Sequence, residues 1–507
     1  MINIKLLIED KWYPCESKGE FIYKDIKVTF NDGKLCITGD KTPVMQICAE
    51  MDNIFFNDAL ILGDAWERGY SDLEWKKPDF SRKLPWYFFA YEDKKTYGFG
   101  VKTLPNSICY WNCDGDKITL TADIKNGNKG LVLDGKTLDV CQVITGEYEG
   151  DAFDSARDFC SKLCDTPRNC GPIFGGNDWY CNYGNNSFEK ILTHARRVAE
   201  CSRNCENKPY MVIDDGWQIC HNGGEGDAYF NGGPWSYCNM NFGDMKAMAD
   251  AIADVGVIPG IWMRPLWTAE KLPEEWVLKN NGIKVTLDPS VPDVLEQVKS
   301  DIRTICNWGY KLIKHDFSTF DYFGRWGWQI DDAFCVTEGE PFDKTLTNAQ
   351  IIKIFYYAIR EAAGEDVLIM GCNTIAHLSA GIFDIQRTGD DTSGYEWERT
   401  KKYGTNTLAF RMLHHNTFGC VDADCVGITR AIPWEKNKLW LDVVSKSGTA
   451  LFVSIADDAY TDEVQKDITS AFEKIDKNTK PSKPLDWMET LMPTKWQSVY
   501  GIDEYNW

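Results

Sequence analysis

The stretch Lys314-His315-Asp316 places a lysine two residues before a carboxylate. It follows an apolar pair, which is typical of a buried strand that ends at the charged triplet. Residues two apart on a strand point to the same face, so the Lys314 amine can stabilise the charged form of the Asp316 carboxylate. An ionised carboxylate at a strand end can act as a nucleophile. Asp316 is therefore the first candidate for a catalytic residue, and the alternative interpretation is a salt bridge at the strand end.

The elements that would position Asp316 form a repeated strand-then-helix pattern from about residue 171. Strands are predicted at 173–177, 210–214, 257–263, 310–316, 367–372, 383–388, 417–422 and 449–454. Apolar residues with a period near 3.6 predict helices at 188–201, 244–254, 292–308, 348–363, 436–447 and 462–477. The predicted fold class is α/β, with a (β/α)8 TIM barrel whose chemistry lies at the carboxyl ends of the strands.

The first 165 residues show a different pattern of short segments separated by turn pairs. Asp114-Gly115 and Asp134-Gly135 are typical hairpin turns, and residues 117–122 alternate polar and apolar. This predicts an all-β sandwich domain that precedes the barrel and packs on it or forms the rim of the site. We predict three parts: the sandwich domain at 1–165, the catalytic barrel at 166–480 and a C-terminal tail at 481–507 that packs on the barrel.

Acidic and aromatic residues gather at the predicted carboxyl ends of the eight strands. In strand order the candidates are Trp179, Asp214, Asp215, Trp262, Arg264, Lys314, Asp316, Asn373, Arg387, Asp390, Asp391, Asp422 and Asp424. Carboxylates in such numbers repel one another unless metal ions, basic groups or hydroxyl donors share the space. No histidine pair and no calcium-loop spacing accompanies them, so the hydroxyl groups of a sugar are the better ligand. No metal site and no cofactor is predicted.

The amino-acid composition limits which classes of partner the chain can bind. The formal net charge of −21 argues against a nucleic acid or an anionic membrane as a partner, because both need clustered Lys and Arg. Twenty Trp and 22 Tyr suit sugar rings, whose C–H faces are apolar. The sequence shows neither a signal peptide nor an apolar run long enough to span a membrane, so we expect a cytoplasmic protein whose 19 cysteines are mostly free thiols.

Three motifs together resemble the retaining α-galactosidases of glycoside hydrolase families 27 and 36, and family 36 most closely. They are residues 210–217 (YMVIDDGW), Lys314-His315-Asp316 and residues 387–392 (RTGDDT). The resemblance runs in order through residues 170–480. It implies that Asp316 is the nucleophile and Asp391 the acid/base of a double displacement. The neighbouring Asp390 is the rival for the acid/base role.

The resemblance also implies how a galactose unit would be held. Asp214 and Asp215 would bind the 4- and 6-hydroxyls, and Lys314 the 3- and 4-hydroxyls. The further residues expected to contact or brace the sugar are Trp179, Trp262, Arg264, Asn373, Arg387 and Asp424. The expected ligand is a galactose-containing oligosaccharide or glycoconjugate, and whether the chain forms a homo-oligomer stays open.

Two departures from the family pattern leave alternatives open. Residues 372–377 (CNTIAH) replace the usual Cys-x-x-Gly-Gly-Gly loop, so carbon 2 could bear a hydroxyl or an N-acetyl group. Arg264 stands where many members carry Glu, which raises the option of an acidic glycoside. We therefore expect an exo-acting α-galactosidase. The alternatives are an α-N-acetylgalactosaminidase, a transglycosylase of the raffinose-synthase kind, a non-catalytic sugar-binding barrel and a metal-dependent barrel enzyme.

Overall fold

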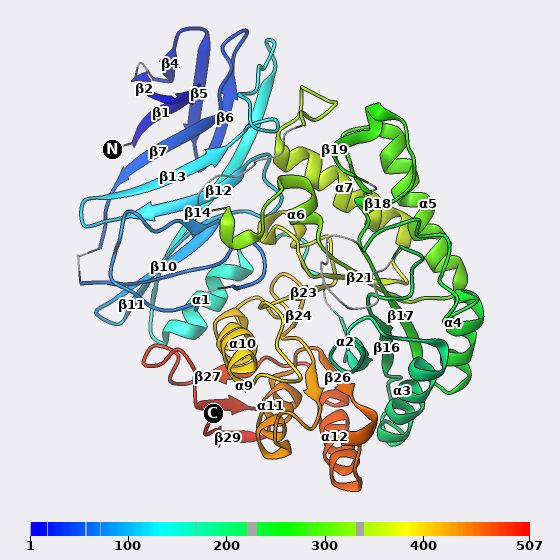
Figure 1. Cartoon of the computed structure of the whole chain (residues 1–507). Helices are drawn as coiled ribbons and strands as arrows, with labels where there is room; N and C mark the ends of the chain where they lie inside the picture. Colours follow the sequence, from blue (N-terminus) through cyan, green and yellow to red (C-terminus); the bar gives the residue numbers. More distant parts are fainter. Residues whose placement is uncertain are drawn as a thin grey trace.

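The computed structural model describes residues 2–17, 19–55, 58–70, 72–168, 170–220, 231–282, 284–330 and 339–507. Strands of the N-terminal region, drawn in blue and cyan, stand beside a ring of strands and helices drawn from green to orange (Figure 1). The predicted fold class, a (β/α)8 barrel preceded by an all-β sandwich, is confirmed.

The barrel is a sheet in which every neighbouring pair of strands is parallel. Within the described residues its nine strands are, in spatial order, β24 (Cys420–Asp422), β23 (Ile385–Arg387), β22 (Leu368–Gly371), β21 (Leu312–His315), β17 (Ile258–Met263), β16 (Tyr210–Ile213), β15 (Phe174–Asn177), β26 (Leu451–Ile455) and β25 (Val426–Ile428). The Ala450 amide donates to the Val421 carbonyl at 3.0 Å and so joins the β24 end to β26. Eight of these strands overlap the predicted ones, and the short β25 is additional.

Helices cover the outside of this sheet. The long ones are α3 (Phe188–Cys201), α4 (Met245–Asp254), α5 (Pro292–Trp308), α7 (Asn348–Ala363), α11 (Trp434–Ser447) and α12 (Asp462–Asp476). Shorter helical segments lie in the connections between these elements. They are α2 (Trp179–Asn182), η2 (Glu274–Trp276), α6 (Ser318–Phe323), η3 (Gly327–Gln329), α8 (Ala376–Ser379), α9 (Trp397–Arg399), η4 (Thr400–Asn406), α10 (Thr407–Arg411) and η5 (Asp457–Ala459).

Local sequence signals explain where these helices start and end. The Ser187 hydroxyl accepts from the Lys190 amide at the start of α3, and Thr347 with Gln350 forms a capping box at the start of α7. Helix α5 ends at Gly309, whose φ of 109° suits a residue without a Cβ. Its buried face repeats every three to four residues, which gives the amphipathic pattern that the sequence shows.

The N-terminal region contains two antiparallel sheets that pack face to face. One, in spatial order, consists of β2 (Lys11–Pro14), β1 (Ile2–Ile8), β7 (Gln46–Asp52), β13 (Lys117–Asp123), β12 (Ile108–Cys113) and β9 (Leu84–Pro85). The other consists of β3 (Glu16–Ser17), β4 (Phe21–Tyr23), β5 (Ile26–Asn31), β6 (Lys34–Thr38), β14 (Thr137–Glu149), β11 (Lys95–Val101), β10 (Tyr87–Glu92) and β8 (Leu60–Gly63). Side chains of both sheets form one apolar core.

Helix α1 (Ala152–Ser161) connects this region to the barrel. Smaller sheets follow, one of β18 (Trp267–Thr268), β20 (Lys284–Leu287) and β19 (Val277–Asn281), and one of β27 (Lys483–Pro484), β28 (Lys495–Ser498) and β29 (Gly501–Glu504). The last of these is drawn in red near α11 (Figure 1), and Lys446 of α11 bonds Asp503 of β29 at 2.9 Å.

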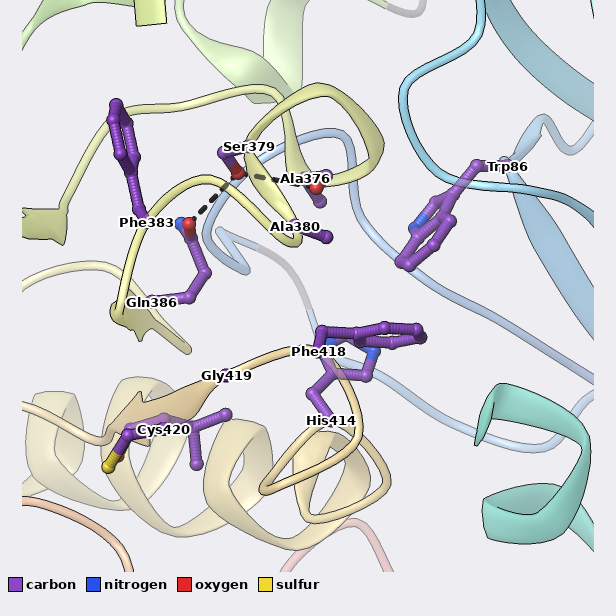
Figure 2. A pocket seen from close by; sticks show the side chains of 11 residues that line it. Trp86, Ala376, Ser379, Ala380, Phe383, Gln386, His414, Phe418, Gly419 and Cys420 are labelled. Carbon is purple, nitrogen blue, oxygen red and sulfur yellow. Dashed lines mark hydrogen bonds between the residues drawn. The ribbon is translucent and has the colours of Figure 1, made fainter. Parts of the chain in front are cut away.

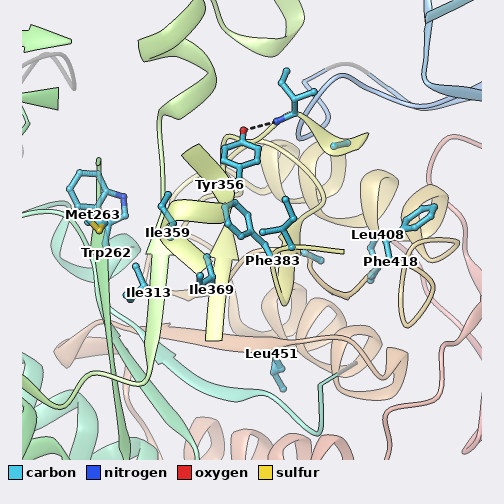
Figure 3. Packing of buried hydrophobic residues seen from close by; sticks show 14 of the residues in the cluster. Trp262, Met263, Ile313, Tyr356, Ile359, Ile369, Phe383, Leu408, Phe418 and Leu451 are labelled. Atoms are coloured by element: carbon cyan, nitrogen blue, oxygen red, sulfur yellow. Dashed lines mark hydrogen bonds between the residues drawn. The ribbon is translucent and has the colours of Figure 1, made fainter. Parts of the chain in front are cut away.

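The main apolar core lies between the barrel strands and their helices. Figure 3 shows part of it, with Ile313 and Ile369 from neighbouring strands and Tyr356 and Ile359 from α7. The same cluster includes aromatic side chains of the N-terminal region, among them Trp86 and Phe159. The two regions therefore share a buried surface, and this contact matters for the site.

Candidate active site

Asp316 follows β21 and is nearly buried, with 8% of its surface accessible. Its Oδ2 accepts from the Trp262 indole nitrogen at 3.0 Å, and its Oδ1 accepts from the Phe317 amide at 2.8 Å. Phe317 has a φ of 63°, a conformation that a bulky residue rarely adopts and that costs about 1–3 kcal/mol. Strain of this kind clusters at functional sites, and here it turns the chain directly after the candidate nucleophile.

Lys314 is bonded to a different acid from the one that the strand pattern suggests. Its Nζ donates to Asp214 Oδ2 at 2.7 Å, and both side chains are buried. Burial disfavours the ammonium form, but Asp214, Cys372 and Asp316 together outweigh burial, so the pKa of Lys314 is raised well above its usual value. Asp316 also favours the Lys314 charge, as a smaller contribution. The lysine therefore lies between the two acids and pairs directly with Asp214.

Asp214 and Asp215 follow β16 and are both buried. Asp214 also accepts from Asn177 Nδ2 at 2.6 Å and from the Asp215 amide at 2.9 Å. Asp215 accepts from Gln218 Nε2 at 2.5 Å and from Asn231 Nδ2. The two carboxylates are thus fixed by side chains on their own and neighbouring strand ends.

Asp178, which the sequence analysis did not single out, supports this pair. Its Oδ1 accepts from the Asp214 amide at 2.7 Å. Burial raises the pKa of Asp178 to about 6. Asp422, the last residue of β24, is buried as well. Burial is the main cause that raises the pKa of Asp422 to about 6.

Arg387, at the end of β23, is 1% accessible and joins two carboxylates. Its Nη2 lies 3.2 Å from Asp391 Oδ1 and also contacts Asp424 Oδ2. Asp424 in turn accepts from the Tyr180 hydroxyl and, at 2.8 Å, from the Thr392 amide. Asp424 has a φ of 73°, a second strained position at a strand end. The geometry is that of a buried network that fixes the Arg387 guanidinium.

Asp390 and Asp391 share one guanidinium, which comes from the N-terminal region. Arg68 Nη1 lies 3.0 Å from Asp391 Oδ1, and Arg68 Nη2 lies 3.0 Å from Asp390 Oδ1. The backbone reinforces this contact, because the Gly69 amide donates to the Thr388 carbonyl and the Asp390 amide donates to the Gly69 carbonyl, both at 2.9 Å. The segment around residue 68 is therefore attached to the loop that bears the two acids.

The two neighbouring acids have different proton affinities. Burial raises the pKa of Asp390, because Arg68 only partly offsets it. Burial acts on Asp391 too, but Arg68 and Arg387, with smaller contributions from Lys314 and Arg399, outweigh it and hold the pKa of Asp391 at about 2. In this structure Asp391 is thus the ionised member of the pair, and Asp390 binds a proton more readily.

Cys372 lies between the Asp316 side and the Asp391 side of the cluster. Its Sγ accepts from Arg68 Nη1 at 3.2 Å and from Arg387 Nη1 at 3.7 Å. Burial is the main cause that raises the pKa of the thiol, and Asp316 adds to it. The thiol therefore stays protonated while its electrostatic neighbours include Asp316 and both arginines. The thiol thus contacts the cations beside Asp391 and lies within the electrostatic influence of Asp316.

Asn373, in the loop after β22, reaches the N-terminal region as well. Its Nδ2 donates to Glu67 Oε1 at 3.0 Å and to the Tyr70 hydroxyl at 2.9 Å. Its backbone carbonyl accepts from Ser318 and Thr319 at the start of α6. Asn373 is 1% accessible, so it holds the loop in place between the barrel and the N-terminal region.

Arg264 is completely buried after β17. Its Nε and Nη2 donate to the Asp321 carboxylate of α6 at 2.5–3.2 Å, and its guanidinium lies 4.3 Å from the Phe317 ring centroid. A planar guanidinium matches a carboxylate well in this geometry. In this structure Arg264 thus braces α6 and the turn after Asp316, and a direct contact with a ligand stays a prediction.

The two predicted aromatic walls differ in exposure. Trp262 is 1% accessible and reaches the site through its indole nitrogen. Trp179 on α2 is partly exposed and lies 5.3 Å from the Tyr183 ring, which lies 5.6 Å from the ring of the exposed Tyr395. Trp179, Tyr183 and Tyr395 thus form a continuous row of rings that runs out from the strand ends.

Sequence reasoning missed Glu67, Arg68 and Tyr70, because all three come from the β region. The only sequence signal was local: an acid, a base and two aromatics stand together in residues 66–70 (WERGY), between strands that are otherwise apolar or alternating. Nothing in that run indicates which part of the barrel it meets.

One cavity where the N-terminal region meets the barrel is too small for a sugar. Figure 2 shows this cavity between Trp86 of the N-terminal region and the residues around β23 and β24, including Gln386, His414 and Phe418. Its volume is about 20 Å³, which suits a single water molecule. Among the described residues no group of three or more His, Cys, Asp or Glu could hold a metal ion, and no helix is both long and apolar enough to cross a membrane.

Known structures share this architecture. An α-galactosidase from Thermus thermophilus in complex with p-nitrophenyl α-D-galactopyranoside superposes with a TM-score of 0.62 over 99% of both chains, at 17% identity. The chain has the fold of an α-galactosidase. The family 36 α-galactosidase AgaA from Geobacillus stearothermophilus, as a variant in complex with raffinose, gives a TM-score of 0.62 over 98% of this chain and 78% of that one, at 11% identity.

The galactosidase domain of an α-galactosidase–sucrose kinase gives a TM-score of 0.60 at 14% identity, over 98% of this chain and 70% of that one. No protein-family model matches the chain. At these identities the comparisons bear on the fold, and the chemistry has to be argued from the side chains.

Proposed function

We propose that the chain is an exo-acting retaining α-galactosidase that hydrolyses terminal α-D-galactosides of oligosaccharides or glycoconjugates. The observation that supports this most is the joining of acids from separate strands into one cluster. Asp316 follows β21 and Asp391 follows β23. The charge of Lys314 interacts with both carboxylates, and Arg387 lies 3.2 Å from Asp391. Two carboxyl groups that flank one anomeric carbon are what a retaining glycosidase needs.

In the proposed mechanism Asp316 attacks the anomeric carbon as the bond to the leaving oxygen breaks. The Trp262 and Phe317 N–H groups orient its carboxylate for this attack. Asp391 gives a proton to the leaving oxygen, and the galactosyl group is then an ester on Asp316. Asp391 next takes a proton from water, which attacks the anomeric carbon and frees Asp316 with net retention.

The galactose unit would be held by the acids that follow β16. Asp214 and Asp215 accept hydrogen bonds, as hydroxyl groups at carbons 4 and 6 require, and Lys314 donates one. Arg387 would lie near carbon 2. Ile375, Ala376 and His377 occupy the loop positions where the family carries glycine. Asn373 of the same loop is bonded to Glu67 and Tyr70, and a filled, fixed loop favours a hydroxyl over the larger N-acetyl group at carbon 2.

The choice between Asp391 and Asp390 as the acid/base rests on two opposing observations. The four-residue spacing from Arg387 favours Asp391, whereas its pKa of about 2 and the raised pKa of Asp390 favour Asp390 as the proton carrier of the ligand-free protein. We assign the role to Asp391, because its spacing from Arg387 matches the Arg-x-x-x-Asp pattern that the resemblance implies. Its protonation then requires that a cation moves away when substrate binds.

Azide rescue tests the mechanism. Asp316→Ala should lose hydrolysis of p-nitrophenyl α-galactoside, and azide should restore turnover with β-galactosyl azide as the product, because azide attacks from the face that Asp316 vacates. Azide added to an Asp391→Ala variant should give α-galactosyl azide instead. Wild-type turnover in Asp316→Ala would remove Asp316 from the mechanism. Parallel assays with the N-acetyl analogue would reveal the alternative specificity.

A further inference from the structure

A second cavity is lined by Arg68 and other residues of the N-terminal region, together with Gly327 and Trp328 of η3. Its volume is about 170 Å³, room for several water molecules and far more than the cavity in Figure 2. Its lining combines aromatic and charged side chains: Asp64, Trp66, Arg68, Tyr70, Asp72, Arg82, Lys83 and Trp328. Asp64 is already paired, since Arg411 Nε donates to it at 2.8 Å.

The chemistry of this lining suits a sugar ring. Aromatic faces stack on the C–H face of a ring, and Arg and Lys donate to hydroxyl oxygens. Trp328, in η3, is 56% accessible at the edge of the cavity, so its face is open to a ligand. The Glu67 carboxylate accepts from the Gly327 amide at 3.3 Å and ties η3 to the segment that bears Arg68.

Arg68 is common to the cavity and to the acids. It lines the cavity, and two of its nitrogens contact Asp390 and Asp391 at 3.0 Å each. Its Nε donates to the Tyr70 hydroxyl at 3.1 Å, so each of the three guanidinium nitrogens already has a partner without a ligand. A hydroxyl oxygen in the cavity that bonds Arg68 competes with these contacts for the guanidinium.

We propose that this cavity binds the leaving group of the glycoside, a polyhydroxylated ring, and that Arg68 is a positioning residue that couples its binding to the Asp390/Asp391 pair. The inference rests on the proposed function, because a proton donor must stand beside the leaving oxygen. The leaving group therefore extends past Asp391, and the cavity adjoins that acid through Arg68. Arg82, Lys83 and Trp328 then determine which leaving groups are accepted.

The coupling explains how an ionised Asp391 could become a proton donor. A leaving group that draws Arg68 away removes one of the cations that hold the pKa of Asp391 low. The other groups that act on the pair remain in place: Arg387 of β23, Lys314 of β21, Arg399 of α9, Tyr180 of α2 and Tyr183 beside it. Among the groups that act on Asp390 and Asp391, Arg68 is the one that also lines the cavity.

Two substrates separate the cavity from the chemistry. Raffinose carries a bulky polyol leaving group, whereas α-galactosyl fluoride has a leaving atom that cannot fill the cavity and needs little protonation. Trp328→Ala and Lys83→Met should each lower kcat/KM for raffinose about 10- to 100-fold, because a stacking or charged contact with the leaving group is lost. The same variants should change kcat/KM for α-galactosyl fluoride less than about threefold. Trp12→Ala, at an exposed tryptophan of β2, serves as the control.

Arg68 is tested by the pH profile of kcat/KM for raffinose. In Arg68→Met the alkaline limb should move to higher pH, because Asp391 then keeps its proton longer, and Arg68→Lys should move it back toward wild type. A merely structural role would lower activity without moving the limb. The inference would be overturned, with the proposed function left standing, by either of two results. One is an alkaline limb of Arg68→Met at the wild-type pH, and the other is an equal loss of kcat/KM on raffinose and α-galactosyl fluoride in the cavity variants. If wild-type protein cleaves neither substrate, both proposals fail.

Discussion

The two halves of the candidate site are built differently. Asp214, Lys314 and Asp316 are buried, and their partners come from the barrel itself. The side chains of Asp390 and Asp391 are 20% and 37% accessible, and they share Arg68, which lies 323 residues before Asp391 in the sequence. The residues proposed to hold the sugar are thus positioned by contacts within the barrel. The acids proposed to face the leaving group depend on a contact from the N-terminal region.

The largest expected effect concerns the leaving-group half. Asp391→Asn should lower kcat for raffinose about 100- to 10,000-fold, because general acid catalysis is lost. The same variant should retain far more activity on α-galactosyl fluoride, whose leaving group needs little protonation. Asp390→Asn is the matched comparison. If Asp390→Asn shows the larger loss on raffinose, the acid/base role belongs to Asp390.

The buried half should respond in stability as well as activity. Lys314→Met leaves the buried Asp214 carboxylate without its cation, and breaking such a pair costs about 3–5 kcal/mol. Urea unfolding followed by circular dichroism measures this. Lys246→Met, which breaks the exposed pair with Asp250 on α4, should cost less than about 1 kcal/mol. Equal losses in the two variants would show that the Lys314 pair is no more important than a surface contact.

Asp178 should make stability depend on pH. Its pKa in the folded protein is raised from 3.8 to about 6, so between these values the folded state holds a proton that the unfolded state has released. Stability therefore falls as pH rises through this window, by about 3 kcal/mol at most. Asp178→Asn removes this dependence, so the stability of the variant relative to wild type should rise between about pH 4 and pH 6 and level off at higher pH.

Urea unfolding at several pH values tests the Asp178 prediction, with Asp158→Asn, at an exposed position of α1, as the control. A stability difference between Asp178→Asn and wild type that stays constant with pH would show that this carboxyl is not protonated near pH 5.

A smaller effect concerns the orientation of Asp316. Trp262→Phe removes the indole N–H that donates to Asp316 Oδ2 and should lower kcat about tenfold, with KM nearly unchanged. Trp434→Phe removes an equivalent bond to Asp467 on the outside of the barrel and should leave kcat as it is. If both variants keep wild-type kcat, the indole does not contribute to catalysis.

The sequence predicts the barrel half of the site better than the other half for a physical reason. Parallel strands place their carboxyl ends at one edge, so strand prediction alone brings Asp214, Lys314 and Asp316 together. It could not give the partner of Lys314, because a long side chain can reach either acid. It also could not give the partner of Arg264, since Asp321 lies on a short helix that has no strong periodicity of its own.

The contribution of Arg68 was beyond sequence reasoning for a further reason. Its segment joins the barrel by backbone pairing between Gly69 and Gly389, a contact between two regions that no local pattern encodes. The sequence predicted that the N-terminal region packs on the barrel or rims the site, and the structure adds which residues reach the acids. Such contacts between regions have to be seen in three dimensions.

Covalent trapping tests the central claim most directly. 5-Fluoro-α-galactosyl fluoride should form an ester that is slow to hydrolyse, and mass spectrometry of a protease digest should find the added sugar on the peptide that contains Asp316. Wild-type protein should be labelled in step with its loss of activity, and Asp316→Ala should not be labelled. Inactivation without a label, or a label on a peptide that lacks Asp316, would contradict the assignment of this carboxylate as the nucleophile.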